Sequence, residues 1–478
     1  MRARPLISKS MIRPVNRGLE EPASARADRV FLLGLMTPML MRVLDTSMLS
    51  VALPTIRQMF GIPSDVMGWV VTAYFLPSIM FMPLYGRLGD EFGKRGIFLA
   101  GIGVFLGGAV LTLCANDLWM LIAGRVVQGI GAAGVIPFCI ALIAEHYPAH
   151  EQGRALGTWN SMGPIATIVG PFLAGFLIDQ IGWRAILGPV VVVGVAAFLA
   201  VRSQIPSIQR GLLQSARSHS FDWGGAILLS CAIVLLTFYA SSRPITGVDA
   251  LQDWRLLLAA LVLFGGLVLW ERRHRNPFVA LNILTNRNFS LASLGSGIRM
   301  FTMEGIGFLM PLYLNDIYAS NASVVGSLVT LHAIALLITM RMGGQLTDRW
   351  GSRWPVLIGL SVQAGTMGYF ALLPGTCPLG VVSVGLIAHG LGAGLSLAAL
   401  HQVSLSKIAP DQRSMAASLY SMIRFSGTVY GAALGGVVLE YGLIRSPSTI
   451  AAYHFVFRFV AAVAVLGVVC GWAIRERS

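Results

Sequence analysis

Several ionisable side chains lie inside long apolar stretches, where a charge is costly and usually serves a function. Two of them are carboxylates, Asp45 and Glu304. A carboxyl group in a partly hydrated cavity of low dielectric constant binds its proton more tightly than in water, so it can load and release a proton as its exposure changes. Four others are arginines: Arg42, Arg125, Arg299 and Arg424. Together these residues predict proton exchange or the binding of a charged substrate.

The two carboxylates have different neighbours in the sequence. Arg42 lies three residues before Asp45. If these two pair, Asp45 stays ionised and becomes structural; otherwise it is the leading candidate for proton or substrate coupling, and we favour that role. Glu304, five residues after Arg299, is the second candidate and could bind a proton or a cationic group. His332 and His389 could titrate near neutral pH, but we expect them to be buried hydrogen-bonding residues.

A ten-residue element occurs twice in the chain, as GRLGDEFGKR and as GQLTDRWGSR. The shared positions are Gly86, Leu88, Asp90, Gly93 and Arg95 in the first copy, and Gly344, Leu346, Asp348, Gly351 and Arg353 in the second. Each copy is expected to form a short charged break between two apolar spans. Its glycines would permit a tight reversal and close helix approach, while its aspartate would accept hydrogen bonds from helix N-termini. Such a repeat predicts two homologous helical bundles of the same orientation.

The composition is that of an integral membrane protein. Of 478 residues, 55% are hydrophobic and only 12% are charged, and the mean hydropathy is +0.72. A soluble chain carries about one-quarter charged residues, so most residues here must face lipid or other apolar helices. Repeated apolar runs are long enough to cross a bilayer as helices, and about fourteen of them are expected.

The net charge of +14 could suggest a nucleic-acid partner, but the distribution of basic residues argues against one. Lys and Arg concentrate in the N-terminal tail and in segments expected on the same side, such as loop 271–287. This bias predicts that both termini lie in the cytoplasm, with attraction to anionic lipid headgroups as a secondary reading.

The apolar runs predict an all-α membrane protein in five segments: a cytoplasmic basic tail 1–29, an N-terminal six-helix bundle 30–201, a connector 202–287 with two extra transmembrane helices, a C-terminal six-helix bundle 288–474 and a cytoplasmic tail 475–478.

The repeated element resembles the signature loop between the second and third spans of the major facilitator superfamily. The resemblance implies the fold of that superfamily, and it implies that Asp90 holds the bundles together in one access state and releases them in the other. The equivalent Asp348 of the second copy is assigned the same role. The element LDTS at 44–47, followed by VALP at 51–54, is similar to the first span of the fourteen-span drug:proton antiporters of the EmrB/QacA type. Arg125 and Gln128 fit their fourth span, in which the arginine tunes a neighbouring carboxylate.

A run of small residues resembles the antiporter signature in the fifth span. Its positions are Gly157, Gly170, Pro171 and Gly175. Ala166 and Ala174 stand where glycines are usual in that family, but small residues still allow close helix packing.

These features predict a proton-coupled exporter of toxic amphiphiles that works by alternating access in the bacterial inner membrane. An excess of intramembrane arginines over carboxylates leaves room for an anionic or zwitterionic amphiphile or metabolite, and a uniporter or a non-transporting receptor are further alternatives. The sequence has no P-loop and no clustered histidines, so ATP-driven export and an enzyme are disfavoured. No cofactor or metal is expected; the expected partners are the substrate, protons, the bilayer and an optional periplasmic adaptor protein.

Overall fold

The computed structural model describes residues 21–205, 222–241, 247–274, 278–279, 281–406, 408–409 and 412–474. Within these ranges the side chains of 21–27, Asp90, 149–150 and Ser414 are not described. Most of the predicted basic tail, the connector arginines Arg210 and Arg217 and the tail 475–478 therefore lie outside the described residues.

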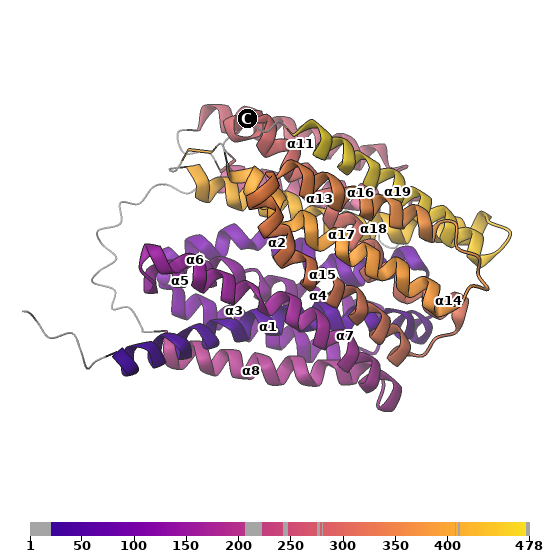
Figure 1. Ribbon diagram of the computed structural model, residues 1–478, viewed down its shortest axis with the longest axis horizontal. Helices are drawn as coiled ribbons and strands as arrows, with labels where there is room; N and C mark the ends of the chain where they lie inside the picture. Colours follow the sequence, from indigo (N-terminus) through magenta and orange to yellow (C-terminus); the bar gives the residue numbers. More distant parts are fainter. Residues whose placement is uncertain are drawn as a thin grey trace, which may run out of the picture.

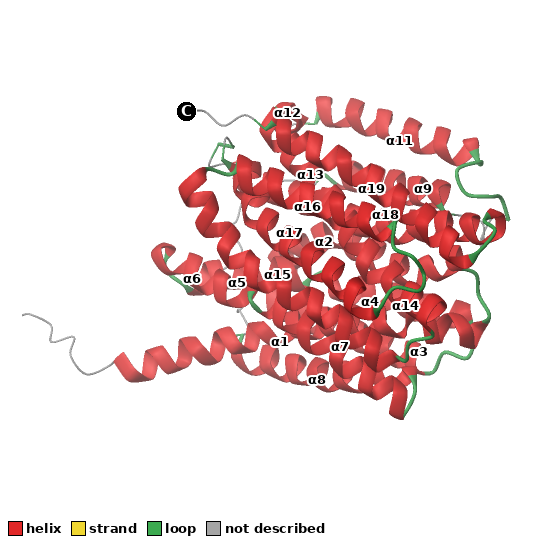
Figure 2. Ribbon diagram, turned by 45° about the vertical axis from the view of Figure 1, so that its right-hand side comes forward, coloured by secondary structure: helices red, strands yellow, loops and turns green. Residues whose placement is uncertain are grey.

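The described ranges consist of helices joined by loops and turns, without a strand (Figure 2). Helices satisfy their own backbone hydrogen bonds, which is required where water is absent. The N-terminal bundle contains α1 (Glu21–Phe60), α2 (Ser64–Phe92), α3 (Lys94–Leu113), α4 (Leu118–Ala132), α5 (Val135–His146), α6 (Ala149–Asn160), α7 (Met162–Gln180), the short turn η1 (Trp183–Ile186) and α8 (Leu187–Gln204).

The C-terminal bundle contains α13 (Arg287–Glu304), the π-helical turn η3 (Gly305–Leu309), α14 (Met310–Tyr318), α15 (Ala322–Trp350), α16 (Arg353–Phe370), α17 (Leu379–Leu405), α18 (Arg413–Arg445) and α19 (Thr449–Ala473). Figure 1 shows the N-terminal bundle in indigo and purple beside the C-terminal bundle in orange and yellow.

Two helices between the bundles match the predicted insert: α9 (Trp223–Ala240) and α11 (Trp254–Arg273), followed by the short α12 (Leu281–Thr285). The carboxylate of Asp222 joins the pair, because it caps α9 at Gly225 N (2.8 Å) and accepts a hydrogen bond from Trp270 Nε1 of α11 (2.7 Å). Trp69 of α2 stacks on Phe238 of α9, so the insert packs against the N-terminal bundle.

Twelve helical segments of the described chain are long and apolar enough to cross a membrane. The prediction of about fourteen is not confirmed, because α13 and α16 are not among the twelve. The cause is polar content: α13 carries Arg287, Arg299 and Glu304, and α16 carries Arg353 and Gln363.

The repeated ten-residue element is mostly helical, and the prediction that it forms a loop is wrong. Gly86 lies in the last turns of α2 and Gly344 in those of α15. The reversal takes place at Gly93 (φ +93°) and Gly351 (φ +79°), a backbone conformation that favours glycine. Close helix approach was also expected at the first glycine, but a Cβ at either Gly86 or Gly344 would meet open space.

The arginine that ends each copy attaches the next helix to the last helix of its own bundle. Arg95 Nη2 donates to Arg202 O of α8 (2.6 Å), and Arg353 Nη2 donates to Trp472 O of α19 (3.2 Å). The repeat therefore stabilises equivalent packing in both bundles.

The two bundles meet along α2 with α18 and along α7 with α15. A Cβ at Gly175 of α7 would lie 2.5 Å from Ala322 O, and a Cβ at Gly436 of α18 would lie 2.5 Å from Ser64 O. Only glycine permits these approaches. We name the two ends of the molecule after positive-φ glycines: the Gly93 end, which also holds Gly351, and the opposite Gly182 end.

Candidate functional site

The buried carboxylate Asp45 lies at the centre of a polar cluster in the N-terminal bundle. Its Oδ2 accepts a hydrogen bond from Arg125 Nη1 at 2.7 Å, and its Oδ1 accepts one from Gln128 Nε2 at 2.9 Å. Arg125 Nη1 also donates to Gln128 Oε1 at 2.8 Å. Each of the three side chains is at most 2% exposed. Every carboxylate oxygen therefore has a donor.

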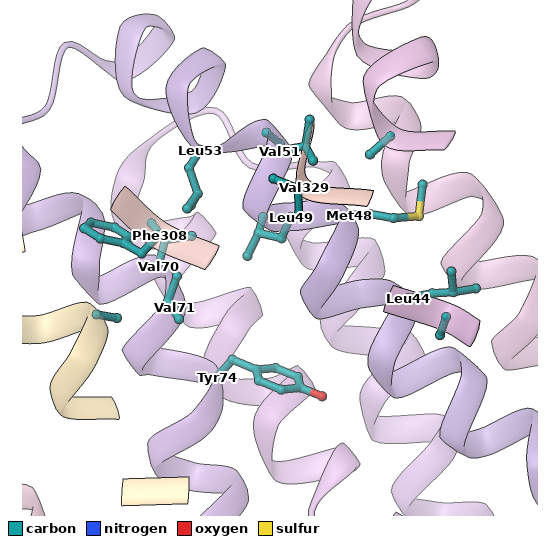
Figure 3. Close-up of a cluster of buried hydrophobic side chains, with 14 of the residues drawn as sticks. Leu44, Met48, Leu49, Val51, Leu53, Val70, Val71, Tyr74, Phe308 and Val329 are labelled. Atoms are coloured by element: carbon teal, nitrogen blue, oxygen red, sulfur yellow. The ribbon is translucent and has the colours of Figure 1, made fainter. Parts of the chain in front are cut away.

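Two helices supply this cluster. Arg125 and Gln128 lie one turn apart on α4, so both face α1. On its other side the Arg125 guanidinium donates from Nε to Val70 O of α2 (3.3 Å) and lies 4.5 Å from the centre of the Tyr74 ring. Figure 3 shows Val70, Val71 and Tyr74 of α2 among the buried apolar side chains of α1, which exclude water from the cluster.

The structure answers the question of how Asp45 is paired. Its partner is Arg125 rather than Arg42, whose guanidinium lies 5.3 Å from the centre of the Phe425 ring of α18. Taking two charges out of water is costly, and the pair repays that cost through short, well-oriented hydrogen bonds. Removing one partner would leave an uncompensated buried charge, at a cost of roughly 3–5 kcal/mol.

Glu304 occupies a different environment, at the last residue of α13 before the π-helical turn η3. Such turns are frequent at functional sites. Its backbone is close to α18, because a Cβ at Gly431 would lie 2.8 Å from Glu304 Cβ. It does not pair with Arg299, which donates from Nε to Ala393 O of α17 (2.9 Å).

The buried histidines of the C-terminal bundle hydrogen-bond to each other, His332 Nε2 with His389 Nδ1 at 3.0 Å. Gln363 Nε2 lies 3.4 Å from His389 Nε2 and donates to Thr302 Oγ1 at 3.0 Å. The expectation that both histidines are buried hydrogen-bonding residues is confirmed.

The residues of the antiporter signature differ in their packing. A Cβ at Gly170 would collide with Ser47 of α1, Gly175 touches α15, and a Cβ at Gly326 of α15 would lie against Pro171 O. Gly157, in contrast, faces open space, so the close-packing prediction is wrong there.

The predicted bundle-holding aspartates are only partly placed. Asp348 is exposed at the end of α15, and the Asp90 side chain lies outside the described residues. Their holding role stays a prediction.

A second set of polar residues, missed from the sequence, links the bundles at the Gly182 end. Asp179 of α7 accepts hydrogen bonds from the first amides of α15, Ala322 N at 3.0 Å and Ser323 N at 2.9 Å. Glu440 of α18 accepts one from Ser64 N, the first amide of α2, at 2.9 Å. Asp179 follows the interface glycine Gly175 by four residues, and Glu440 follows Gly436 by four. This equal spacing is the sequence feature from which the two links could have been predicted.

A third link at the same end joins α1 to α14 and α19. Arg57 of α1 forms an ion pair with Asp316 of α14, and Tyr453 of α19 donates its hydroxyl to Asp316 Oδ2 at 2.6 Å. Together the three links hold the two bundles closed at the Gly182 end.

The fold defines a membrane protein of two repeated helical bundles. Residues 36–294 and 292–478 match the Major Facilitator Superfamily, and the chain belongs to this superfamily. Membership indicates a membrane transporter rather than an enzyme.

Its relatives include proteins named for different substrates. The chain is 27% identical over 385 residues to the riboflavin transporter RibZ of Clostridioides difficile (strain 630), covering 80% of this chain and 82% of that protein. It is 29% identical over 398 residues to the multidrug resistance protein Stp of Mycobacterium tuberculosis (strain CDC 1551 / Oshkosh), covering 83% of this chain and 73% of that protein.

The fold resembles a solved bacterial homologue of the human lysosomal transporter Spinster in an inward-facing, occupied conformation. The TM-score is 0.68 at 15% identity, over 96% of this chain and 97% of that one. At this identity the likeness concerns the fold alone.

Proposed function

We propose that the protein is a proton-coupled exporter of toxic amphiphiles that works by alternating access in the bacterial plasma membrane. The observation that carries the proposal is the buried Asp45–Arg125–Gln128 cluster, a titratable group placed in an apolar interior. Membership of the superfamily and the multidrug-named relative support the class. The EmrB/QacA subtype is part of this proposal, because the first-span and fourth-span elements resemble that subtype.

Coupling follows from what a proton does to the cluster. Protonation of Asp45 removes its charge and weakens its hydrogen bond from Arg125. The Arg125 guanidinium retains Val70 O, Gln128 Oε1 and the Tyr74 ring as partners. Its charge is therefore stabilised whether Asp45 is ionised or protonated. Asp45 would load a proton from the acidic side and release it inside, while substrate leaves in exchange. Glu304 is the reserve carrier.

Access is controlled at the two ends of the molecule. We assign the Gly182 end to the non-cytoplasmic side, because the positive-inside bias favours cytoplasmic termini. Opening outward then requires that the links of Asp179, Glu440 and Asp316 break. Asp90 and Asp348 are proposed to hold the Gly93 end when it closes.

Fourteen spans remain part of the proposal, with α13 and α16 as crossings in addition to the twelve apolar segments. Both helices contribute buried side chains to the C-terminal bundle, which shields their polar residues from lipid. Labelling of single cysteines at 245 and 280, after replacement of the five native cysteines, should place these positions on opposite sides. Labelling from the same side would remove the two-helix insert of α9 and α11 from this topology.

A second candidate is transport of a metabolite, which the riboflavin transporter relative favours. Everted vesicles separate the candidates. The vesicles are acidified, and ethidium or riboflavin is then added outside. Ethidium-dependent loss of the proton gradient, present only in vesicles that contain the protein, supports drug antiport. A response to riboflavin alone supports the second candidate. Uptake of either compound that leaves the gradient unchanged would contradict proton coupling.

A further inference from the structure

Two arginines from opposite bundles share one aromatic ring. The guanidinium carbon of Arg42 in α1 lies 5.3 Å from the centre of the Phe425 ring, and that of Arg424 in α18 lies 4.6 Å from the same centre. Arg424 also interacts electrostatically with Arg299 of α13. Arg42 and Arg424 thus come together where the two bundles meet, and Arg299 lies deeper in the C-terminal bundle.

These cations retain unused hydrogen-bond donors. The buried nitrogens Arg42 Nε, Arg424 Nε and Arg299 Nη1 have no hydrogen-bond partner among the described residues. The buried hydroxyl of Tyr420, which interacts electrostatically with Arg299 and Arg424, has none either. Arg42 is 6% and Arg299 only 1% exposed, so water cannot freely satisfy them. A buried donor without an acceptor is costly, and a buried charge more so.

The protein does not neutralise this charge with its own nearby carboxylates. Asp45 is engaged by Arg125 and Gln128. Glu304 forms no ion pair with a described basic residue. Arg424 is instead surrounded by like charge from Arg42 and Arg299, which repels it. Such an arrangement favours an added anion.

We propose that Arg42, Arg299 and Arg424, with the hydroxyl of Tyr420, form the binding site for the anionic group of an amphiphilic aromatic anion. A guanidinium presents paired N–H donors that match the two oxygens of a carboxylate or sulfonate. Beside the cations, Phe425 packs with the buried Ile79 of α2 and Val429 of α18, and this apolar surface would receive the body of the ligand. The site rests on the proposed transport function and names its substrate class.

The location makes the site sensitive to the access state. Arg42 belongs to the N-terminal bundle, whereas Arg299 and Arg424 belong to the C-terminal bundle. When the bundles move relative to each other, the donors separate and the anion is held by fewer of them. Affinity would therefore fall as the transporter changes state, as release requires.

The test is calorimetric titration of the purified full chain in non-ionic detergent with 2-naphthoate and with 2-naphthamide, which has a similar shape but no charge. We expect naphthoate to bind and the amide to bind at least about tenfold more weakly, since hydrogen bonds to charged groups contribute roughly 1.5–3 kcal/mol. Arg42→Gln/Arg424→Gln should weaken naphthoate binding roughly 10- to 100-fold.

The matched control is Arg458→Gln, which removes an exposed arginine of α19 and should leave binding unchanged. Thermal unfolding without ligand identifies variants that fail to fold. If the double variant does not fold, Arg42→Gln alone is tested, because no described carboxylate pairs with Arg42. Equal binding of acid and amide, no binding of naphthoate, or unchanged binding in the folded arginine variants would overturn the site. Ethidium export with no naphthoate binding would overturn this inference alone, whereas naphthoate binding without any proton coupling would overturn only the proposed antiport.

Discussion

The two bundles repeat the same framework contacts at corresponding positions. Gly93 and Gly351 end their helices with positive φ, and Arg95 and Arg353 hold the next helix to the last one. At the interface, Asp179 caps α15 of the other bundle and Glu440 caps α2. These shared features concern reversals, packing and closure, which both bundles need in order to move as units.

The polar cores inside the bundles differ. In the N-terminal bundle a carboxylate meets a guanidinium, and the charges of Asp45 and Arg125 balance. In the C-terminal bundle the corresponding region holds Arg299 and the His332–His389 pair, and no described carboxylate pairs with Arg299. The difference separates a repeated framework from diverged polar residues, to which we assign separate chemistry in our proposals: proton binding at Asp45 and anion binding at the arginines between the bundles.

The largest effect is expected from Asp45→Asn. An amide preserves the shape of the carboxyl group but cannot exchange a proton, so gradient-driven transport into everted vesicles should fall to background. Asp117→Asn, which changes an exposed helix cap to another good cap, is the matched control. Full activity of Asp45→Asn together with an inactive Glu304→Gln would move the proton carrier to α13.

Part of this comparison could be predicted from the sequence. The repeat and the apolar runs predicted two helical bundles and the insert of α9 and α11, because each depends on local pattern. Asp45 and Arg125 could be selected because charge is rare in apolar stretches. Sequence spacing alone favoured Arg42 as the partner of Asp45, whereas the resemblance of the fourth span implied a carboxylate beside Arg125. The packing of α4 on α1 decides between the two arginines.

Other features of the structure depend on three-dimensional packing, which residue spacing in the sequence does not reveal. The repeated element was predicted as a loop, but its apolar and small residues continue α2 and α15 until Gly93 and Gly351. The mutual hydrogen bond of His332 and His389 requires two helices far apart in sequence. The equal spacing of Gly175–Asp179 and Gly436–Glu440 is present in the sequence. That the two carboxylates cap helices of the other bundle follows only from the contact between the bundles.

A smaller effect, on stability, should distinguish the two cores. Arg125→Leu leaves Asp45 buried without its counter-ion and should lower the free energy of unfolding by roughly 3–5 kcal/mol. Arg299→Met should cost less, because it removes a charge that has no described counter-ion. Thermal unfolding in detergent provides the comparison. An equal or larger loss for Arg299→Met would show that the C-terminal core is also charge-balanced.

The links at the Gly182 end should be equivalent in the two bundles. Asp179→Asn and Glu440→Gln each remove a negative charge from a helix N-terminus, an interaction of about 0.3–1 kcal/mol. Each should raise the fraction of molecules open at this end roughly two- to fivefold, measured by distances between spin labels on α7 and α15. A change in only one variant would contradict the symmetry of the closure.

Effects on stability alone are expected at the glycines of the repeat. Gly93→Ala and Gly351→Ala place a Cβ at positive φ and should each cost about 1–3 kcal/mol of stability. Gly86→Ala and Gly344→Ala lie in helices beside open space and should be neutral or stabilising by about 0.5–1 kcal/mol. Thermal unfolding of the four variants checks this order, and a destabilised Gly86→Ala would show that the first glycine has a packing role.

The separation of proton and anion chemistry is tested most directly by comparing two modes of 2-naphthoate transport in proteoliposomes. Exchange of labelled for unlabelled naphthoate requires only the anion site, whereas accumulation against a gradient also requires the proton carrier. We predict that Asp45→Asn retains exchange and loses proton-driven accumulation, while Arg42→Gln/Arg424→Gln loses both. Loss of exchange in Asp45→Asn, or full exchange in the arginine variant, would contradict the assignment of these two functions to separate sets of residues.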